Sequence, residues 1–393
     1  MRIAFYAPLK SPTHENPSGD RRVAGLLMQA LEHAGHRVDL ASTLRTYDGA
    51  GDAACQAALR DQGTAIGREL TARWRAVPRE VRPELWFTYH VYYKAPDWLG
   101  PLVSAALGIP YVVAEASFAP KRAGGRWAIG HQAARDAIVH ADLLLCPTRD
   151  DMACLESLVI GRERLVLLPP FLDAAPYRQA QCARAAHRAS LAAAHGLDAS
   201  VPWIVVVAMM RPGDKLASYR ALASVLERLL DLPWQIVVAG DGPARGEVAA
   251  ALDAAVAGRS RFLGALALPA LAAVYAACDL CVWPAVIEAY GMAMLEAQAA
   301  GVPVVSCALR GVPDVVEHGR TGLLAPPGDE AALALLVRQL LCDVPRRKSM
   351  GQAASVFAGG ERGIEAAALR LDAVLRPVVA DGKARAEASI PAR

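Results

Sequence analysis

The order of strand-like and helix-like segments constrains the fold of this chain more than any other feature of its sequence. Short runs rich in valine, isoleucine, leucine and aromatic residues alternate with segments that have helical spacing, such as 20–35 and 96–108. Strands that alternate with helices form parallel sheets covered on both faces. The sequence therefore predicts an α/β fold.

The alternation occurs twice, with a strand-free segment over 169–200 between the two series. The chain has 393 residues, of which 54% are hydrophobic, so it is long enough for two cores. We predict two doubly wound, Rossmann-like domains over 1–170 and 201–360, joined by a connection over 171–200. Their sheets would face a central cleft, where such sheets bind ligands. The expected strands are 2–7, 36–41, 84–89, 110–114, 141–146 and 164–169, then 202–210, 234–240, 261–266, 279–284, 302–307 and 321–326.

Composition excludes several classes of protein. The formal net charge of +3, from 42 basic and 39 acidic residues, gives no reason to expect nucleic acid as a partner. The N-terminal segment looks like a strand and not like a signal peptide, so we expect a cytoplasmic location. The most apolar window, 265–287, is broken by Pro269, Asp279 and Pro284, which argues against a membrane span.

The eight cysteines are scattered, and the only close pair is Cys278 and Cys281. Side chains three residues apart on a strand point to opposite faces, so we expect free thiols and no metal site.

Two glutamates near the end of the second series have a spacing that suggests a ligand site. Glu288 and Glu296 are eight residues apart, and on a helix this is about 12 Å, enough to hold two parts of one elongated ligand. Glu288 follows an expected strand and precedes an expected helix at Tyr290, where unpaired amides favour an anion. The alternative is that Glu288 only caps the helix and Glu296 is a solvated surface carboxylate.

Cations and glycines follow two other strands of the same series. Arg211 and Lys215 come directly after the strand at 202–210, where they could bind a pyrophosphate or could be ordinary surface basic residues of a loop. Gly240 and Gly242 form a tight turn after the next strand; their spacing is weak as a nucleotide fingerprint, and a bare turn without ligand contact is equally compatible. If a sugar left a nucleoside diphosphate here, these cations and the amides of Tyr290 and Gly291 would stabilise the charge on the leaving group.

The order of these motifs over residues 203–330 resembles the second domain of the retaining GT-B glycosyltransferases of family 4, the group 1 glycosyl transferases. The matching segments are Arg211 with Lys215, then AGDGP, DLCVWPAVIEAYGMAMLEAQAAGVPVV and GVPDVVEHGRTGLLAPPGD. The resemblance implies that Glu288 holds the donor sugar, Glu296 the ribose, and the two cations the diphosphate. It places Ala289, Tyr290 and Gly291 at the donor. It also implies a helix near 361–378 that crosses back to the first domain, so that 361–393 would be a crossover helix and a polar, frayed tail.

The first domain resembles the family less closely. Its opening pattern implies that Ser18 and Gly19 approach the donor phosphates through backbone atoms. Many members have a histidine after a first-domain strand, where this chain has Glu115 and Ser117. His90, which ends the preceding strand, is a candidate sugar contact or a local hydrogen-bonding residue. Lys121 and Arg122 could face an anionic acceptor or water.

Together these features predict a retaining transferase that moves a sugar from a nucleoside-diphosphate sugar to an acceptor hydroxyl. No D-x-D motif is present and fixed cations can stabilise the charge, so we expect neither a metal nor a cofactor. The alternatives are a nucleotide-sugar epimerase and a non-catalytic nucleotide-sugar-binding protein. The basic stretch 67–87, with Trp74 and five arginines, could rest on anionic lipid at the inner face of a membrane or could be a solvated helix face.

Overall fold

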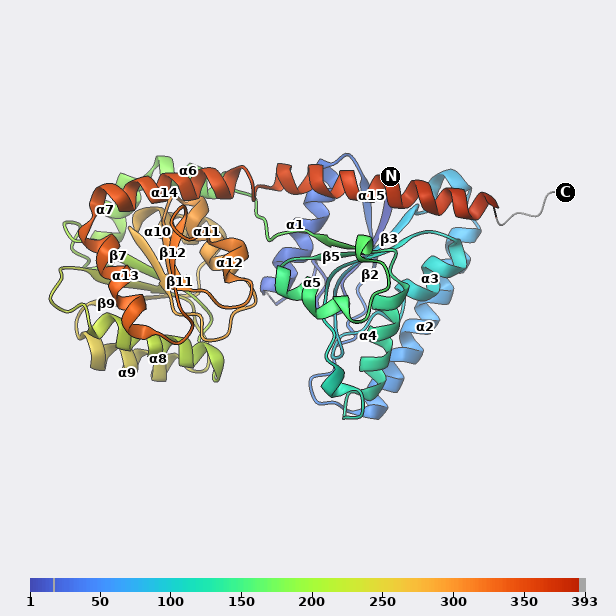
Figure 1. The fold of residues 1–393 in the computed structure, drawn as a ribbon, viewed down its shortest axis with the longest axis horizontal. Coiled ribbons are helices and arrows are strands. Elements are labelled where there is room, and N and C mark those ends of the chain that lie inside the picture. The colour runs from blue at the N-terminus through green and yellow to red at the C-terminus, as the bar shows by residue number, and fades with distance from the viewer. Residues whose placement is uncertain (17, 389–393) are drawn as a thin grey trace. The chain divides into compact units, whose positions relative to one another are not determined.

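The computed structural model describes residues 1–16 and 18–388, and the chain divides into two compact units (Figure 1). The first unit contains Met1–Pro169 and the helix that begins at Ile364, and the second contains Pro170–Gly363. The two units are described separately below.

The first unit is built on a six-stranded parallel sheet with the order β2-β1-β3-β4-β5-β6. Every strand expected in the first series is present, with ends that differ by a few residues at most. The strands are β1 (Arg2–Tyr6), β2 (Arg37–Ser42), β3 (Leu85–Val91), β4 (Tyr111–Ala116), β5 (Leu143–Cys146) and β6 (Leu165–Leu167). The helices are α1 (Gly19–His33), α2 (Ala53–Arg75), α3 (Gly100–Leu107), α4 (Ala128–His140), α5 (Arg149–Glu156) and α15 (Ile364–Ala388).

The second unit repeats the architecture with the order β12-β11-β10-β7-β8-β9, again parallel. Its strands are β7 (Trp203–Val207), β8 (Gln235–Ala239), β9 (Ser260–Gly264), β10 (Leu280–Trp283), β11 (Val304–Cys307) and β12 (Gly322–Ala325). Its helices are α6 (Ala175–Cys182), α7 (Arg184–His195), α8 (Asp214–Glu227), α9 (Arg245–Val256), α10 (Leu268–Ala277), α11 (Met292–Ala299), α12 (Val312–Val315), α13 (Glu330–Cys342) and α14 (Val344–Gly359). The α/β fold with two doubly wound sheets is thus confirmed.

The segment 171–200, expected as a connection, forms α6 and α7, which pack on α10 of the second unit. Arg184 and Arg188 of α7 each donate to the carboxylate of Asp279, at 2.7 and 3.0 Å. Asp279 also accepts a hydrogen bond from the backbone N–H of Trp203, at 2.8 Å. These contacts tie α7 to the starts of β7 and β10.

The final helix α15 packs on α1 within the first unit. It runs to Ala388, ten residues beyond the end that the family resemblance implied, so residues 380–388 of the expected frayed tail are helical. Residues 389–393 of that tail lie outside the described residues. Among the described helices, none is both long and apolar enough to cross a bilayer.

In each sheet the order of the strands reverses at one place, and this place determines where ligands can bind. The reversal lies between β1 and β3 in the first unit and between β7 and β10 in the second. In open α/β sheets ligands bind outside the carboxyl ends of the strands at such a reversal. The loops that follow these four strands are therefore the first places to look for a site.

Candidate functional site

The carboxyl ends of β7 and β10 bring Lys215 and Glu288 together. The ammonium nitrogen of Lys215 donates to Glu288 Oε2 at 2.6 Å, and the indole N–H of Trp283 donates to the same oxygen at 3.2 Å. The two charged side chains are only 20% and 17% exposed. The Lys215 ammonium also lies 5.3 Å from the centre of the Trp283 ring, within cation–π range. A partly buried ion pair therefore stands at the reversal point of the second sheet.

The local structure around Lys215 and Arg211 differs in one respect from the expectation that both lie on a loop. Gly213, at φ +81°, precedes α8, so Lys215 lies in the first turn of that helix. Arg211 is on the loop itself and is exposed. The carbonyl of Arg211 accepts the amide of Leu216 at 3.1 Å, which holds the loop against the helix start.

The structure corrects the spacing argument for Glu288 and Glu296. The helix begins at Met292 and not at Tyr290, because Gly291 takes a left-handed conformation with φ +80° and precedes its first turn. Glu288 lies on the bend before this turn, so the two glutamates do not share one helix and the helical rise does not measure their separation.

Glu296 is not a solvated surface carboxylate, which was the alternative from sequence. It is 4% exposed, and the hydroxyl of Tyr275 donates to its Oε2 at 3.2 Å. Burial and the neighbouring Glu296 raise the pKa of Tyr275 far above its usual value, so this hydroxyl remains a donor. The same hydroxyl also lies 3.0 Å from the carbonyl of Ala293, so its one proton is shared between two acceptors. Glu296 is thus a buried carboxylate in contact with Tyr275.

Gly240 and Gly242 are required by the packing of two loops. They have φ of +139° and +153°, and a Cβ atom on either would overlap a backbone carbonyl, that of Ala208 or of Met210. The amide of Met210 donates to the carbonyl of Asp241 at 2.9 Å, so the loop after β8 lies directly against the loop that carries Arg211. The glycines position that loop, and no ligand contact is needed to explain them.

The segment after Glu288 is also hydrogen-bonded to the turn that follows another strand, β11. The carbonyl of Ala289 accepts the amide of Gly311 at 3.0 Å, which links it to the turn after β11. Tyr290 is half-buried against the core of the second unit. The loops after β7 and β10, which carry Arg211 and Glu288, are thus each hydrogen-bonded to the loop of a neighbouring strand.

In the first unit, the carboxyl ends of β3 and β4 bring His90 and Glu115 together with Asp20 of α1. His90 Nδ1 lies 3.0 Å from Asp20 Oδ1 and 3.6 Å from Glu115 Oε1. The hydroxyl of Tyr89 donates to Glu115 Oε2 at 3.2 Å. Burial lowers the pKa of His90, but Glu115 and Asp20 outweigh this effect and raise it overall. Asp20 was missed from sequence, although an acidic residue directly after a helix cap is a recognisable signal.

Among the described residues, four other than glycine have a left-handed backbone, and each lies near the end of a strand or in the loop after it, at the carboxyl edge of a sheet. They are His90 (φ 63°), Glu115 (58°), Ala285 (53°) and Arg310 (47°). Such conformations cost on the order of 1–3 kcal/mol each and concentrate at functional sites. Their location agrees with binding at these edges.

The remaining residues singled out in the first unit lie around this edge. Ser18 caps α1 by accepting the amide of Arg21 at 3.2 Å. A Cβ atom at Gly19 would meet nothing within 4 Å, so its backbone has open space beside it. Ser117 and Lys121 are exposed on the segment after β4.

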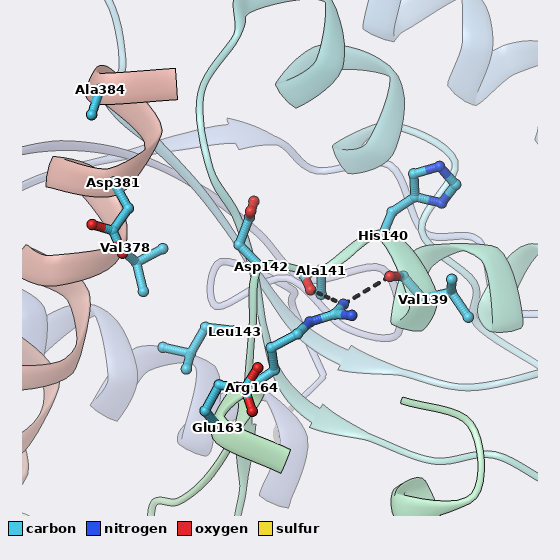
Figure 2. A pocket seen from close by; sticks show the side chains of 10 residues that line it. All are labelled: Val139, His140, Ala141, Asp142, Leu143, Glu163, Arg164, Val378, Asp381 and Ala384. Carbon is cyan, nitrogen blue, oxygen red and sulfur yellow. Dashed lines mark hydrogen bonds between the residues drawn. The ribbon is translucent and has the colours of Figure 1, made fainter. Parts of the chain in front are cut away.

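A cavity of about 780 Å³ lies at the opposite edge of the first sheet, before β5 and β6 and against α15 (Figure 2). The guanidinium of Arg164 points to its floor and donates to the carbonyls of Val139, at 2.7 Å, and Ala141. Asp142 accepts the amide of Tyr111 at 2.9 Å. The Nε of Arg164 is buried without a hydrogen-bond acceptor. The cavity lies at the edge opposite to the carboxyl ends of the strands, where ligands bind in open α/β sheets, so we do not take it as the candidate site.

The basic stretch 67–87 is partly used by the fold. Trp74 packs edge-on against the buried Trp86, with ring centres 6.2 Å apart. Arg75 donates to the carbonyl of Ala106 at 2.6 Å, and Arg82 to that of Val77 at 2.9 Å. The aromatic ring and two of the five arginines are therefore directed at the protein.

Comparison with known proteins finds a family model that matches part of the second unit. The profile of the glycosyl transferases group 1 matches residues 202–343. D-inositol 3-phosphate glycosyltransferase of Nocardia farcinica is 31% identical over 235 residues, which are 58% of this chain and 51% of that protein. The chain spans between about a third and about half of the length of the curated relatives it matches most strongly.

Solved structures show the same two-unit fold over nearly the whole chain. Sucrose-phosphate synthase of Thermosynechococcus elongatus has a TM-score of 0.68 at 21% identity, covering 97% of this chain and 99% of that one. HepE of Anabaena, solved in complex with UDP, has a TM-score of 0.70 at 16% identity, covering 96% and 100%. At these identities the likeness shows the GT-B fold.

Proposed function

We propose that the chain is a retaining glycosyltransferase that moves a sugar from a nucleoside-diphosphate sugar to an acceptor hydroxyl, because residues 202–343 match the model of the glycosyl transferases group 1. The observation that carries the proposal is the partly buried Lys215–Glu288 pair at the reversal point of the second sheet. An ion pair at this place provides a cation for a phosphate and a carboxylate for sugar hydroxyls.

We assign Lys215 and Arg211 to the diphosphate. An ammonium group has three N–H donors, and Glu288 takes one from Lys215, which leaves two for phosphate oxygens. When the bond between the anomeric carbon and the phosphate oxygen breaks, the electron pair and the negative charge go to that oxygen. Fixed cations beside it stabilise this charge more than the charge of the ground state, which is the condition for catalysis.

Glu288 and Glu296 are assigned to the two ends of the donor. Glu288 is oriented by two donors, Lys215 and Trp283, and would accept hydroxyl groups of the sugar. The buried carboxylate of Glu296, in contact with Tyr275, would accept the hydroxyls of the ribose. Both carboxylates are held before the ligand arrives, which lowers the entropic cost of binding.

We assign the acceptor to the first-unit edge with His90 and Glu115. In a transfer with retention, the acceptor oxygen bonds to the anomeric carbon on the face that the phosphate leaves, and the departing phosphate takes the acceptor proton. The departing phosphate thus acts as the base for the acceptor proton, and no basic side chain of the protein is needed for this step. The cations Arg211 and Lys215 serve where other enzymes use a metal, so we propose that no divalent ion is needed.

UDP-sugars are the first donors to test, because HepE was solved with UDP and with UDP-glucose. A panel of UDP-, GDP- and ADP-sugars is screened for thermal stabilisation and for slow hydrolysis of the sugar. We expect one donor to raise the melting temperature and to be hydrolysed, and Glu288→Ala and Lys215→Ala to abolish the hydrolysis.

The matched control is Arg220→Ala, which breaks another ion pair of α8. Arg220 pairs with Glu247 at 3.0 Å, but these side chains are 62% and 57% exposed and lie away from the site. This variant should behave as the wild type. Stabilisation by no donor, or hydrolysis that survives in both site variants, would defeat the proposal; conversion of the donor to an epimer would identify an epimerase, and binding without any turnover a non-catalytic protein.

A further inference from the structure

Two cations beside the first-unit site lie against the same two aromatic rings. The Lys94 ammonium is 5.9 Å from the centre of the Tyr93 ring and 4.9 Å from that of Trp127. The Arg122 guanidinium carbon is 5.5 and 5.2 Å from the same two centres. The rings themselves meet edge to face, with centres 5.5 Å apart. Two like charges thus lie against one pair of rings, and we call the cluster of Tyr93, Lys94, Arg122 and Trp127 the aromatic corner.

The charges of this corner are not neutralised by an ion pair. Within residues 1–16 and 18–388, neither Lys94 nor Arg122 makes a salt bridge with a carboxylate. The buried Nε of Arg122 has no hydrogen-bond acceptor. Asp48 lies behind the corner, but its carboxylate already accepts the amides of Ala50, Gly51 and Asp52 and the amide side chain of Gln56, at 2.8–2.9 Å. A bound anion would therefore offset the repulsion between the Lys94 ammonium and the Arg122 guanidinium.

The corner is rigid before any ligand arrives. The indole N–H of Trp127 donates to the carbonyl of Asp48 at 2.9 Å, and the amide of Asp48 donates to the carbonyl of Lys94 at 2.8 Å. A Cβ atom at Gly130 would overlap the carbonyl of Tyr93, so helix α4, which Trp127 directly precedes, packs against the segment that carries Tyr93 and Lys94. Three loops are thus fixed together around the two cations.

A row of rings connects the corner with His90. The ring of Tyr92 lies 5.1 Å from that of His90 and 5.5 Å from that of Tyr93, which in turn contacts Trp127. His90 lies near the carboxyl end of β3, Tyr92 and Tyr93 follow that strand, and Trp127 lies between β4 and α4, at the edge of the sheet where we place the acceptor. A molecule bound along the row could reach the His90 cluster with one end and the two cations with the other.

We propose that Lys94 and Arg122 form an anion subsite, and that the acceptor of this enzyme carries a phosphate group that binds there. The planar donor fork of a guanidinium and the point charge of an ammonium are the usual protein partners of a phosphate. The inference rests on the proposed function, since it names the class of acceptor. The phosphate can belong to a soluble sugar phosphate or to a lipid headgroup.

The test uses the full chain labelled with 5-fluorotryptophan, whose fluorine signals are followed by NMR. The signal of Trp127 is assigned with Trp127→Phe and that of Trp283, beside Glu288, with Trp283→Phe. Glucose 6-phosphate and inorganic phosphate should shift the Trp127 signal, whereas glucose, and chloride at matched ionic strength, should not. Vesicles of phosphatidylcholine with phosphatidate, compared with phosphatidylcholine alone, show whether a lipid-borne phosphate binds.

Each of Arg122→Ala and Lys94→Ala should weaken phosphate binding by roughly tenfold or more, and Arg122→Lys should restore part of it. Arg73→Ala is the matched control, because the Arg73 guanidinium lies 5.3 Å from the centre of the Trp74 ring, on α2 of the same unit. This control should bind phosphate as the wild type does.

Two results would overturn the inference: a Trp127 signal that no phosphate compound shifts, or equal binding of phosphate in both alanine variants. The Trp283 signal, titrated with UDP in the same samples, reports on the donor site. A response at Trp283 without one at Trp127 would remove the anion subsite and leave the proposed function standing, whereas no response at Trp283 to any nucleotide would count against the function itself.

Discussion

At the scale of single residues, the proposed chemistry depends on the contact between Lys215 and Glu288. Glu288→Gln keeps the size of the side chain and an oxygen acceptor but removes the negative charge that orients the ammonium group. We expect kcat/KM for transfer to fall by roughly two to three orders of magnitude, which is the usual effect of removing one preorganised electrostatic group from an enzyme active site. The melting temperature should change by only a few degrees, because the pair is partly exposed. Steady-state kinetics and thermal unfolding measure the two effects.

The control for this variant is Glu247→Gln, which neutralises the partner of Arg220 on the surface of the same unit. Normal transfer by Glu288→Gln, or a loss of the same size in Glu247→Gln, would be incompatible with a role for the Lys215–Glu288 pair.

The His90 cluster predicts a dependence of stability on pH. The pKa of His90 is raised in the folded protein, chiefly by Glu115 and Asp20 acting against burial, and a further carboxylate, Asp151, acts in the same direction. A raised pKa means that protonated His90 stabilises the fold fully below its unfolded pKa of about 6.5, and that this contribution is lost as pH rises through the folded value. His90→Gln should therefore lower the free energy of unfolding more at pH 5.5 than at pH 9.

Denaturant unfolding of the two proteins at several pH values gives this difference directly. His33→Gln serves as the comparison, since His33 is exposed at the end of α1. If the difference in free energy of unfolding between the wild type and His90→Gln did not change with pH, the neighbouring carboxylates would not raise the pKa of His90.

The individual residues show where sequence reasoning succeeds and where it fails. Glu288 and Lys215 could be found because each follows a strand, and the carboxyl ends of parallel strands lie at one edge of a sheet. Their contact at 2.6 Å could not be predicted, because it depends on the exact start of α8 at Asp214, directly after Gly213. The burial of Glu296 was missed because a carboxylate on a helix is usually solvated, and only the tertiary contact with Tyr275 reveals its setting.

At the scale of the elements, the loop after β8 must lie against the loop after β7 for Arg211 to be in place. Gly242→Ala would force a Cβ into the carbonyl of Met210 and a side chain into a left-handed backbone. We expect a loss of roughly 2–4 kcal/mol in the free energy of unfolding of the second unit, together with weaker donor binding. Chemical denaturation, monitored separately for the two units, is the measurement.

Gly246→Ala, four residues further along the sequence, is the matched control variant. Gly246 lies in α9 with nothing within 4 Å of the added Cβ, so alanine should be neutral or stabilise by up to about 1 kcal/mol. If Gly242→Ala were as harmless as Gly246→Ala, the account of the packed loops would be wrong.

The strands were predictable from sequence because buried parallel strands are short, continuous apolar runs flanked by turn residues. The start of α11 was not predictable, because Gly291 bends the chain after Tyr290 and delays the helix by two residues. The end of α15 was also misjudged. Its polar sequence suggested a frayed tail, but contacts with α1 and Pro110 support the helix in the structure.

At the scale of the whole molecule, we propose that cations of the second unit take the place of a metal. If Arg211 and Lys215 bind the leaving diphosphate as proposed, transfer should proceed at the same rate with and without EDTA. A loss of activity with EDTA that Mg²⁺ or Mn²⁺ restores would contradict this prediction.

The whole fold was more predictable than the site. The two alternating series determine two parallel sheets, and the reversal of strand order then places the binding loops. The aromatic corner of Tyr93 and Trp127 was not foreseen, because its parts are separated by 34 residues and meet only through the loops that follow neighbouring strands.

The most direct test of the central claim is a calorimetric titration of the full chain with UDP, GDP and ADP. The account predicts that one of them binds with a dissociation constant in the micromolar range or below, and that Arg211→Ala and Lys215→Ala each weaken this binding by about tenfold or more while Arg220→Ala does not. Binding of none of the three nucleotides, or binding that Arg211→Ala and Lys215→Ala leave unchanged, would contradict it.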